Sequence, residues 1–336
     1  MKIKQIVFII LDAAAVIATV WIFLNFFGQG PTNTIRVAMT YPYSSLSGLF
    51  FIADNQGYFE KRGLNVIYTP HEGGGAETFD ALRRLEADVV FGTDFRFVTQ
   101  SFDNKNMRVL GSLARSANRT SVVARRDRGI LSIKDLRGKK IAVTPNSSYE
   151  YFLNEFLSKN GLSFLDMDLV YKEPLDAQSS FLAGETDAVI HSEPYLRPIR
   201  DKFGGTIIGW PAQDSDLLWL IVSEKSVIET HKDRLIQFIT AILEAEEYLA
   251  DFPAKAVKII AESAGSGETE ASISKIKYDL SFDESLKQTL EKEIDWWIQY
   301  KYFNKLQRPT ISDFLRSDLL KEIKPEAVEP KSYPQL

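Results

Sequence analysis

The order of strand and helix patterns constrains this chain more than any other feature of its sequence. From residue 34 to residue 91, alternating or apolar runs expected to form strands are separated by runs with helical periodicity. The expected strands are 34–39, 65–68 and 87–91, and the expected helices are 47–56 and 76–86. This order predicts an α/β fold with parallel strands and crossover helices, to which a strand at 109–113 is expected to add.

A second cycle with the same order follows, and we interpret it as an approximate structural repeat. It comprises strands at 121–124, 141–143, 168–171 and 187–190, with helices at 149–158 and 178–183. An apolar strand at 217–222 then returns, and the remainder is mostly helical, with helices at 232–250 and 291–300.

Two lobes follow from this repeat, each built on a mostly parallel sheet flanked by helices. We expect 34–122 to form the first part of lobe 1 and 123–222 to form lobe 2. Residues 223–322 complete lobe 1 with C-terminal helices, and the proline-rich residues 323–336 form a flexible tail.

The N-terminal segment predicts the compartment. Lys2 and Lys4 precede an apolar run over 6–27, which is long enough to span a membrane as a helix. The bulky residues Leu24–Phe27 favour an uncleaved anchor within 1–30, although a cleaved signal segment remains the alternative. With the lysines inside, everything after Gly30 is expected to face the extracytoplasmic side of a bacterial membrane.

Composition excludes several classes of function. The net charge of −5 argues against nucleic-acid binding, because affinity for phosphates requires a basic surface. Three histidines and no cysteines leave little for a zinc site and nothing for a thiol nucleophile. The chain has no hydrolase or phosphate-loop motif either, so we expect no cofactor, no metal and no enzymatic activity.

Five short segments follow one another along the two cycles, namely 53–66 (ADNQGYFEKRGLNV), 81–90 (ALRRLEADVV), 136–143 (LRGKKIAV), 181–188 (FLAGETDA) and 193–195 (EPY). Together they resemble the nitrate/sulfonate/taurine-type substrate-binding proteins of ABC importers. The resemblance covers roughly residues 34–260, in the family's order. It implies a two-lobed periplasmic binding protein type II fold that closes on a small solute. It also implies permease and ATPase partners and a monomeric protein.

Ligands of open α/β sheets bind beyond the carboxyl ends of strands, which selects four loops. In the first, Tyr41, Tyr43, Ser44 and Ser45 could contact an organic solute, or form a turn and a helix cap. In the second, Gly74 and Gly75 could present backbone N–H groups to an anion, or form a flexible turn.

The other two loops carry polar residues that also suit helix caps. Thr93 and Asp94 follow the strand ending at residue 91, and Asp94 could bind an amine or cap the next helix. The fourth loop supplies possible donors to a carboxylate or sulfonate, namely Asn146, Ser147, Ser148 and Tyr149. Ser147 and Glu150 also have capping-box spacing, but the resemblance places this loop at the cleft.

Two charged residues complete the candidate set. Arg115 follows the strand at 109–113 and could pair with an acidic solute, and Glu193 follows the strand at 187–190. We expect the solute to be small and of the sulfonate, nitrate, amine or pyrimidine-like type. Because the candidate charges are mixed, a zwitterionic or neutral heterocyclic solute, such as an amino-sulfonate or a pyrimidine, fits at least as well as a simple anion. A membrane-anchored sensor is the alternative function, and a pyrimidine-synthase-like enzyme is disfavoured because the chain has no cysteine.

Overall fold

A computed structural model describes residues 33–72, 74–213, 215–265, 267–302 and 307–328. The chain divides into a unit of residues 1–34 and a unit of residues 35–336, and the fold below is that of the second. The expected membrane anchor at 6–27 lies outside the described residues. Within the described ranges, no helix combines the length and apolar character needed to cross a membrane.

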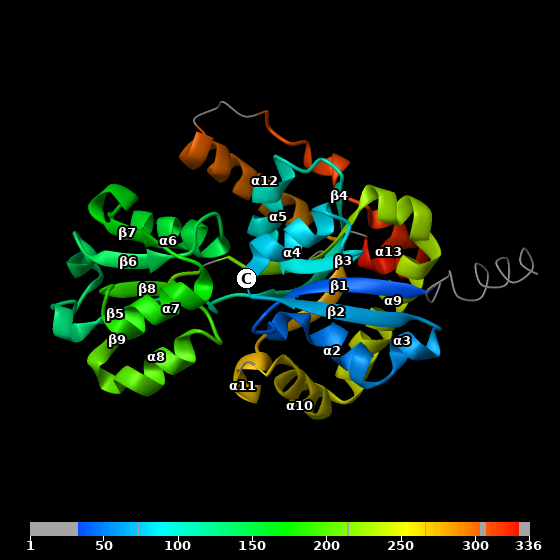
Figure 1. Ribbon diagram of the computed structural model, residues 1–336, viewed down its shortest axis with the longest axis horizontal. Helices are drawn as coiled ribbons and strands as arrows, with labels where there is room; N and C mark the ends of the chain where they lie inside the picture. Colours follow the sequence, from blue (N-terminus) through cyan, green and yellow to red (C-terminus); the bar gives the residue numbers. More distant parts are fainter. Residues whose placement is uncertain (1–32, 73, 214, 266, 303–306, 329–336) are drawn as a thin grey trace, which may run out of the picture. The chain divides into compact units, whose positions relative to one another are not determined.

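The first sheet has six strands, in the order β11-β4-β10-β3-β1-β2 (Figure 1). Their bounds are β1 Thr34–Thr40, β2 Asn65–His71, β3 Val89–Thr93, β4 Met107–Ser116, β10 Leu217–Glu224 and β11 Lys277–Ser281. Strands β1 and β3 are parallel, whereas β10 runs antiparallel to both β3 and β4. Strand β11 is antiparallel to β4.

The second sheet has five strands, in the order β7-β6-β8-β5-β9. Their bounds are β5 Ser121–Arg125, β6 Lys140–Val143, β7 Asp168–Tyr171, β8 Ala188–His191 and β9 Ile207–Pro211. Strand β6 is parallel to β7 and β8, but β5 is antiparallel to β8 and β9. Both sheets are therefore mixed, and the expectation of mostly parallel sheets is wrong.

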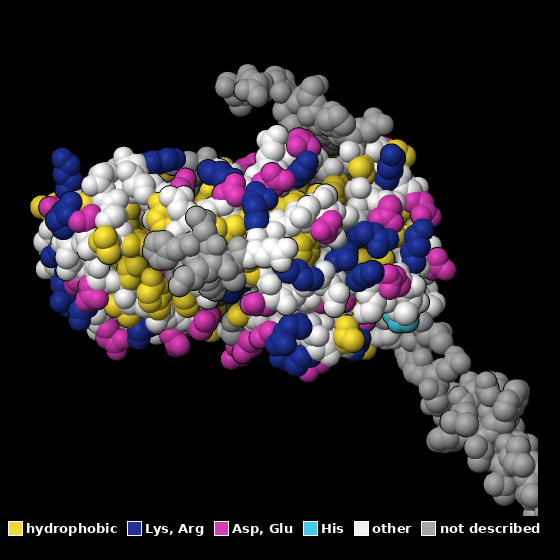
Figure 2. All heavy atoms as spheres, turned by 90° about the horizontal axis from the view of Figure 1, so that it is seen from above, with side chains coloured by type: hydrophobic (Ala, Val, Ile, Leu, Met, Phe, Trp, Pro, Cys, Tyr) yellow, Lys and Arg dark blue, Asp and Glu magenta, His cyan; other side chains and the backbone are white. Residues whose placement is uncertain are grey.

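Helices pack against each sheet, and we call each sheet with its helices a lobe. The first lobe carries α2 Gly48–Asn55, α3 Tyr58–Lys61, α4 Gly74–Arg83, α5 Asp94–Ser101, α9 Lys225–Asp251, α10 Pro253–Ala264, α11 Glu270–Ile273, α12 Glu284–Trp297 and α13 Ser317–Ile323. The second lobe carries α6 Ser148–Lys159, α7 Pro174–Ala183 and α8 Leu196–Phe203. On the face shown in Figure 2, basic and acidic side chains are interspersed.

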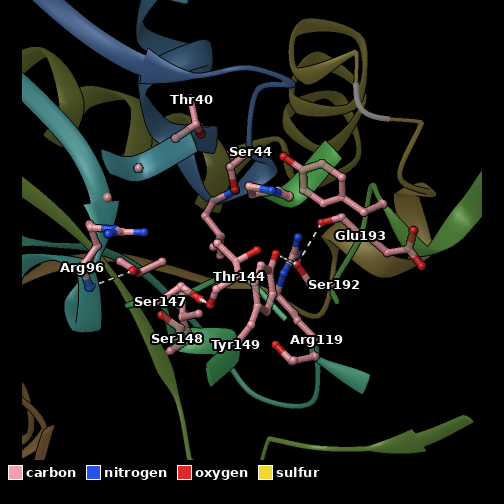
Figure 3. A pocket seen from close by; sticks show the side chains of 18 of the residues that line it. Thr40, Ser44, Arg96, Arg119, Thr144, Ser147, Ser148, Tyr149, Ser192 and Glu193 are labelled. Carbon is pink, nitrogen blue, oxygen red and sulfur yellow. Dashed lines mark hydrogen bonds between the residues drawn. The ribbon is translucent and has the colours of Figure 1, made fainter. Parts of the chain in front are cut away.

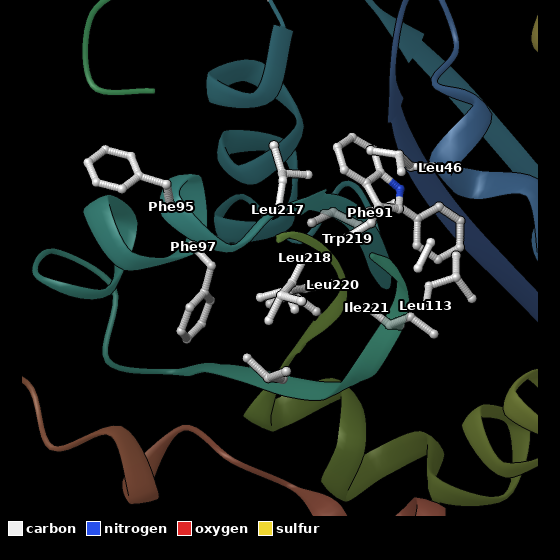
Figure 4. Close-up of a cluster of buried hydrophobic side chains, with 14 of the residues drawn as sticks. Leu46, Phe91, Phe95, Phe97, Leu113, Leu217, Leu218, Trp219, Leu220 and Ile221 are labelled. Carbon is white, nitrogen blue, oxygen red and sulfur yellow. The ribbon is translucent and has the colours of Figure 1, made fainter. Parts of the chain in front are cut away.

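Strand β10 belongs to the first sheet, although the expected second lobe runs through residue 222. All eight of its residues are buried, and Trp219, Leu220 and Ile221 lie in the hydrophobic cluster of Figure 4. An apolar run of this kind fits the centre of either sheet, so its composition does not say which sheet it joins.

Two short connections join the lobes, one between β4 and β5 and one between β9 and β10. The buried side chain of Gln213 links them. Its carbonyl oxygen accepts hydrogen bonds from the backbone N–H groups of Arg119 (3.2 Å) and Thr120 (3.3 Å), and its amide donates to the Ser116 carbonyl. The two connections are therefore held side by side at the base of the lobes.

Candidate functional site

A cavity of about 130 Å³ lies where the ends of the two sheets meet (Figure 3). The first lobe lines it with Thr40, Pro42, Ser44, Leu46, Gly75, Gly92, Thr93, Arg96, Leu217 and Trp219. The second lobe and the first connection add Arg119, Thr120, Thr144, Ser147, Ser148, Tyr149, Glu173, Pro174, Ser192, Glu193, Pro194 and Tyr195. Since one water occupies roughly 30 Å³ of liquid, the cavity suits a small molecule.

Four helices begin at this cavity. Thr93 is the N-cap of α5 and accepts a hydrogen bond from the Arg96 N–H (3.2 Å), and Ser147 is the N-cap of α6. Glu173 is the N-cap of α7, and Gly75 lies in the first turn of α4. A helix N-terminus carries a partial positive charge and unpaired N–H groups, so four of them favour an anion in the space between them.

Arg96 adds a full positive charge. Its side chain is buried, points toward the cavity in Figure 3 and forms no ion pair among the described residues. Burial lowers the pKa of Arg96, and the carboxylates of Glu173, Asp80 and Glu150 offset this in part. Gly75 lies directly against this side chain, since a Cβ at this position would lie 3.4 Å from the Arg96 Cγ, an ordinary van der Waals distance.

Four buried polar atoms in the lining have no hydrogen-bond partner within the described ranges. They are Nη1 of Arg119 and the hydroxyl oxygens of Thr120, Thr144 and Ser148. Buried polar groups are usually paired, and leaving one unpaired costs about 1–3 kcal/mol. Each of these four can donate a hydrogen bond, so together they fit a ligand with several acceptor oxygens.

Glu268 holds Arg119 in place. Its Oε1 lies 3.0 Å from Nη2 of Arg119 and also accepts a hydrogen bond from the Ser45 hydroxyl (2.8 Å). Tyr278 in turn donates to the Ser45 carbonyl (2.7 Å). Ser45 therefore supports the cavity wall from behind and is not part of its lining.

An uncharged aromatic group supports the second-lobe side of the cavity. The His191 ring lies 4.7 Å from Tyr149 and stacks on Tyr195 at 4.3 Å between centroids. Burial lowers the pKa of His191 to about 4, although a hydrogen bond between Nε2 and the Pro174 carbonyl (3.0 Å) opposes this shift. His191 is therefore uncharged at neutral pH, and Tyr149 shares a hydrogen bond of 2.8 Å with Ser192.

Half of the residues predicted as candidates lie in this lining. The cavity brings together Ser44, Gly75, Thr93, Ser147, Ser148, Tyr149 and Glu193. Outside the lining lie Tyr41, Tyr43, Ser45, Asp94, Arg115 and Asn146, and the prediction for Gly74 is not tested.

Specific contacts explain where several of the outside residues lie. Tyr41 is 45% exposed and packs edge-on against Tyr43, away from the lining. Arg115 forms ion pairs with Asp279 (3.4 Å) and Asp283 (2.9 Å) and lines a different, open groove. Its partners lie more than 160 residues further along the chain, so the sequence does not reveal them.

Two capping predictions are wrong in detail. Thr93, not Asp94, caps α5; Asp94 is buried and accepts from the N–H groups of Phe95 (2.8 Å) and Leu218 (2.9 Å). Desolvation raises the pKa of Asp94 to about 7. At α6, Ser147 occupies the N-cap position, but its hydroxyl donates to the Thr144 carbonyl (2.6 Å) and makes no capping hydrogen bond to the helix.

The expected capping box at α6 is also shifted by one residue. Glu150 accepts from the N–H of Asn146 (2.8 Å), whose backbone is left-handed with φ of 53°. The N–H groups at the start of α6 therefore receive no side-chain cap from Ser147, which leaves them oriented for a ligand.

Sequence reasoning missed Arg96 and Glu173. The sequence does carry a signal for Arg96. A cation in the first turn of a helix interacts unfavourably with the helix dipole, so its presence there suggests a functional role. Glu173 precedes Pro174, and proline is common at the first position of a helix. The start of α7 at this point could therefore have been predicted from the sequence.

An α/β fold of two mixed sheets with a solute-sized cavity between them defines a periplasmic-binding-protein-like chain. A model of the NMT1/THI5 like family matches residues 47–256, which is more than half of the sequence. The chain therefore belongs to the NMT1/THI5 like family, and the family resemblance predicted from the sequence is confirmed.

Similar proteins fall mainly among solute-binding proteins. A Bacillus subtilis (strain 168) protein with the provisional name aliphatic sulfonates-binding protein is 28% identical over 208 residues, or 60% of this chain and 61% of the relative. The chain thus spans about three-fifths of the curated relatives it matches.

Solved structures share the fold at lower identity. The alkanesulfonate-binding protein SsuA from Xanthomonas axonopodis pv. citri, bound to MOPS, matches with a TM-score of 0.68 and 16% identity, covering 86% of this chain and 99% of that one. The desulfurization enzyme DSZB matches with a TM-score of 0.63 and 14% identity, covering 86% and 98%. At these identities the structures establish the fold alone, which serves both binding and catalysis.

Proposed function

We propose that this protein is the solute-binding component of an ABC importer and that it captures a small organic anion, with a sulfonate as the favoured head group. The observation that carries the proposal is the buried, positively charged Arg96 at the meeting point of four helix N-termini. A buried charge is costly unless it is paired, and among the described residues Arg96 has no ion-pair partner. An anionic solute would supply one.

The lining suits the geometry of a sulfonate. The planar guanidinium of Arg96 can donate to two oxygens of one head group at once. The hydroxyls of Thr144 and Ser148 and the Nη1 of Arg119 offer further donors. Leu46, Leu217 and Trp219 provide an apolar wall for a short carbon chain.

The charges at the cavity disfavour a solute that is only cationic. Glu193 forms an ion pair with Arg200, and Glu268 is engaged by Arg119. Glu173 is exposed at the edge of the lining and near enough to Arg96 to affect its pKa. An amino-sulfonate therefore remains compatible, with its ammonium group toward Glu173, whereas an amine alone would meet the positive end of the site.

We further propose binding without catalysis. A hydrolytic or transfer reaction needs a nucleophile with a base in hydrogen-bond reach. His191 is neutral and its Nε2 is bonded to the Pro174 carbonyl, while the Ser147 hydroxyl is bonded to the Thr144 carbonyl. The curated relative named for sulfonate binding supports the same role.

For location and assembly we propose a monomer on the extracytoplasmic side, with residues 6–27 as its membrane anchor and a permease and ATPase as partners. A further solved structure with the same fold, named as the periplasmic aliphatic sulphonate binding protein SsuA from Escherichia coli, supports this side of the membrane. Membrane fractionation of the full chain and of residues 31–336 tests the anchor. Equal membrane association of both would contradict it.

Calorimetric titration with ethanesulfonate, taurine, nitrate and ethylamine tests the solute class. We expect at least one sulfonate to bind and ethylamine not to bind. Arg96→Met should weaken sulfonate binding by roughly 10- to 150-fold, the equivalent of about 1.5–3 kcal/mol for hydrogen bonds to a charged group.

Arg84→Met is the matched control, because it removes an exposed guanidinium that pairs with the nearby Glu86 and does not line the cavity. It should leave affinity unchanged. Binding of ethylamine in preference to every anion, or equal sulfonate affinity in the wild type and Arg96→Met, would overturn the proposal.

A further inference from the structure

The two helices that hold the cavity's polar groups also touch each other just beneath it. Helix α5 begins at Thr93 and Arg96 on the cavity, and Phe95 between them is fully buried. Helix α6 begins with Ser148 on the cavity, and Tyr151, three residues later, is buried as well. The rings of Phe95 and Tyr151 stack with centroids 5.3 Å apart and an angle of 19°, so the contact joins the two lobes.

A third helix completes this contact. Trp296, near the end of α12, lies 5.4 Å from Phe95 and 5.3 Å from Tyr151, edge-on to both rings. Helix α12 packs on α5 in the first lobe, so Trp296 brings a first-lobe ring against a second-lobe helix. The sequence predicted a helix at 291–300 within the completion of lobe 1, but it did not predict the contact of this helix with α6.

Polar contacts fix the register of the two lobes here. The indole N–H of Trp296 donates to the Asn154 carbonyl oxygen at 2.9 Å, and both side chains are buried. Next to it, the Lys292 ammonium lies 3.7 Å from the Glu155 carboxylate. Separating the lobes would expose the rings of Phe95, Tyr151 and Trp296 to water. It would also break the hydrogen bond between the Trp296 indole and the Asn154 side chain.

We propose that the arrangement described here is the closed one, and that Phe95, Tyr151, Asn154 and Trp296 form an interlobe latch that holds it in the absence of solute. None of the four lines the cavity, so they act through α5 and α6, whose N-termini they hold in place. Trp296 and Asn154 are thus positioning residues.

The latch has a direct consequence for binding. A solute binds a protein with an affinity reduced by the fraction of molecules that are not in the competent conformation. A latch that populates the closed form before binding raises apparent affinity and slows release. The aromatic cluster of Phe50, Phe59, Phe91 and Phe238 has no such effect, because all of its members lie in the first lobe.

Distance measurement between the lobes tests the latch without any solute. The chain has no cysteine, so Lys258→Cys on α10 and Leu165→Cys in the second lobe can be labelled uniquely for spin or fluorescence distances. In the ligand-free protein we expect one dominant short distance. Trp296→Ala and Asn154→Ala should each lower the closed-to-open ratio about fivefold or more, and lower sulfonate affinity with it.

Phe314→Leu is the matched control, because Phe314 is buried and packs on Phe97 within the first lobe. It should leave the distance unchanged. Asn154→Ala keeps all three rings, so it tests the latch even if Trp296→Ala fails to fold. An open ligand-free wild type, or unchanged distances in Asn154→Ala, would overturn the latch whether or not sulfonates bind.

Discussion

At the residue scale, the site is assembled from groups whose burial in the ligand-free protein costs folding free energy. Arg96 is a buried cation in the first turn of a helix, where the dipole opposes positive charge. Thr144 and Ser148 carry buried hydroxyls with no hydrogen-bond partner among the described residues. Such costs persist in a protein when function compensates them, and an anionic solute would satisfy all three at once.

These residues also show what the sequence could and could not predict. The loops at the carboxyl ends of β1, β3 and β6 were found because the rule that selects them depends only on chain order. Arg96 was missed because a side chain five bonds long reaches the cavity from inside a helix. Arg115 was chosen because it follows a strand, but distant Asp283 neutralises it.

The neutral His191 gives a pH dependence that can be isolated. Its folded-state pKa of about 4 lies below the ordinary value of 6.5, so the unfolded chain takes up the proton first as pH falls. The contribution of neutral His191 to the free energy of unfolding is therefore complete above pH 6.5, and it is lost progressively as the pH falls toward 4. At pH 5 the loss is about 2 kcal/mol relative to neutral pH.

His191→Gln should remove this loss, because glutamine keeps an N–H donor for the Pro174 carbonyl and does not titrate. Urea unfolding of both proteins at pH 7 and pH 5 measures the difference. Asp94, with its pKa raised to about 7, contributes in the opposite direction, but equally in both proteins. An identical pH 7 to pH 5 change in wild type and variant would show that His191 is not held neutral.

At the scale of elements, helix starts define the site more than any single side chain does. Helices α4, α5, α6 and α7 all begin at the cavity, two from each lobe. Hydrophobic periodicity marks these helices and the strands that precede them, and their positions along the chain were predicted well. Strand direction was not, because β5 and β10 are apolar runs whose composition is the same in either orientation, and β9 was not predicted as a strand.

The two serines at the start of α6 are expected to have different roles, Ser148 in binding and Ser147 in stability. Ser148→Ala removes a buried hydroxyl that has no partner among the described residues, so the free protein should melt at the same temperature or slightly higher. Sulfonate binding should weaken, because one donor is lost. Thermal melts with and without ethanesulfonate measure both effects.

Ser147→Ala is the informative counterpart, because its hydroxyl donates to the Thr144 carbonyl. It should destabilise the free protein by about 1 kcal/mol, the usual contribution of one hydrogen bond. If instead Ser148→Ala lowers the melting temperature of the free protein and Ser147→Ala does not, the roles assigned to the two serines are reversed.

At the scale of the whole molecule, the fold places two sheets with their helix N-termini facing one another and joins them by two short connections tied by Gln213. The site is built from both lobes, and we expect the lobes to move about these connections. The division at residues 122 and 222 remains a prediction for the lobes as moving bodies. The anchor at 6–27 remains a prediction as well.

Diffraction from crystals grown with a short sulfonate tests the central claim most directly, because the anomalous signal of sulfur locates the head group without bias. The account predicts a sulfur peak inside the cavity, with the sulfonate oxygens in hydrogen-bond reach of the Arg96 guanidinium and the Ser148 hydroxyl. A sulfonate bound elsewhere on the protein, or inside the cavity but out of reach of Arg96, would contradict it.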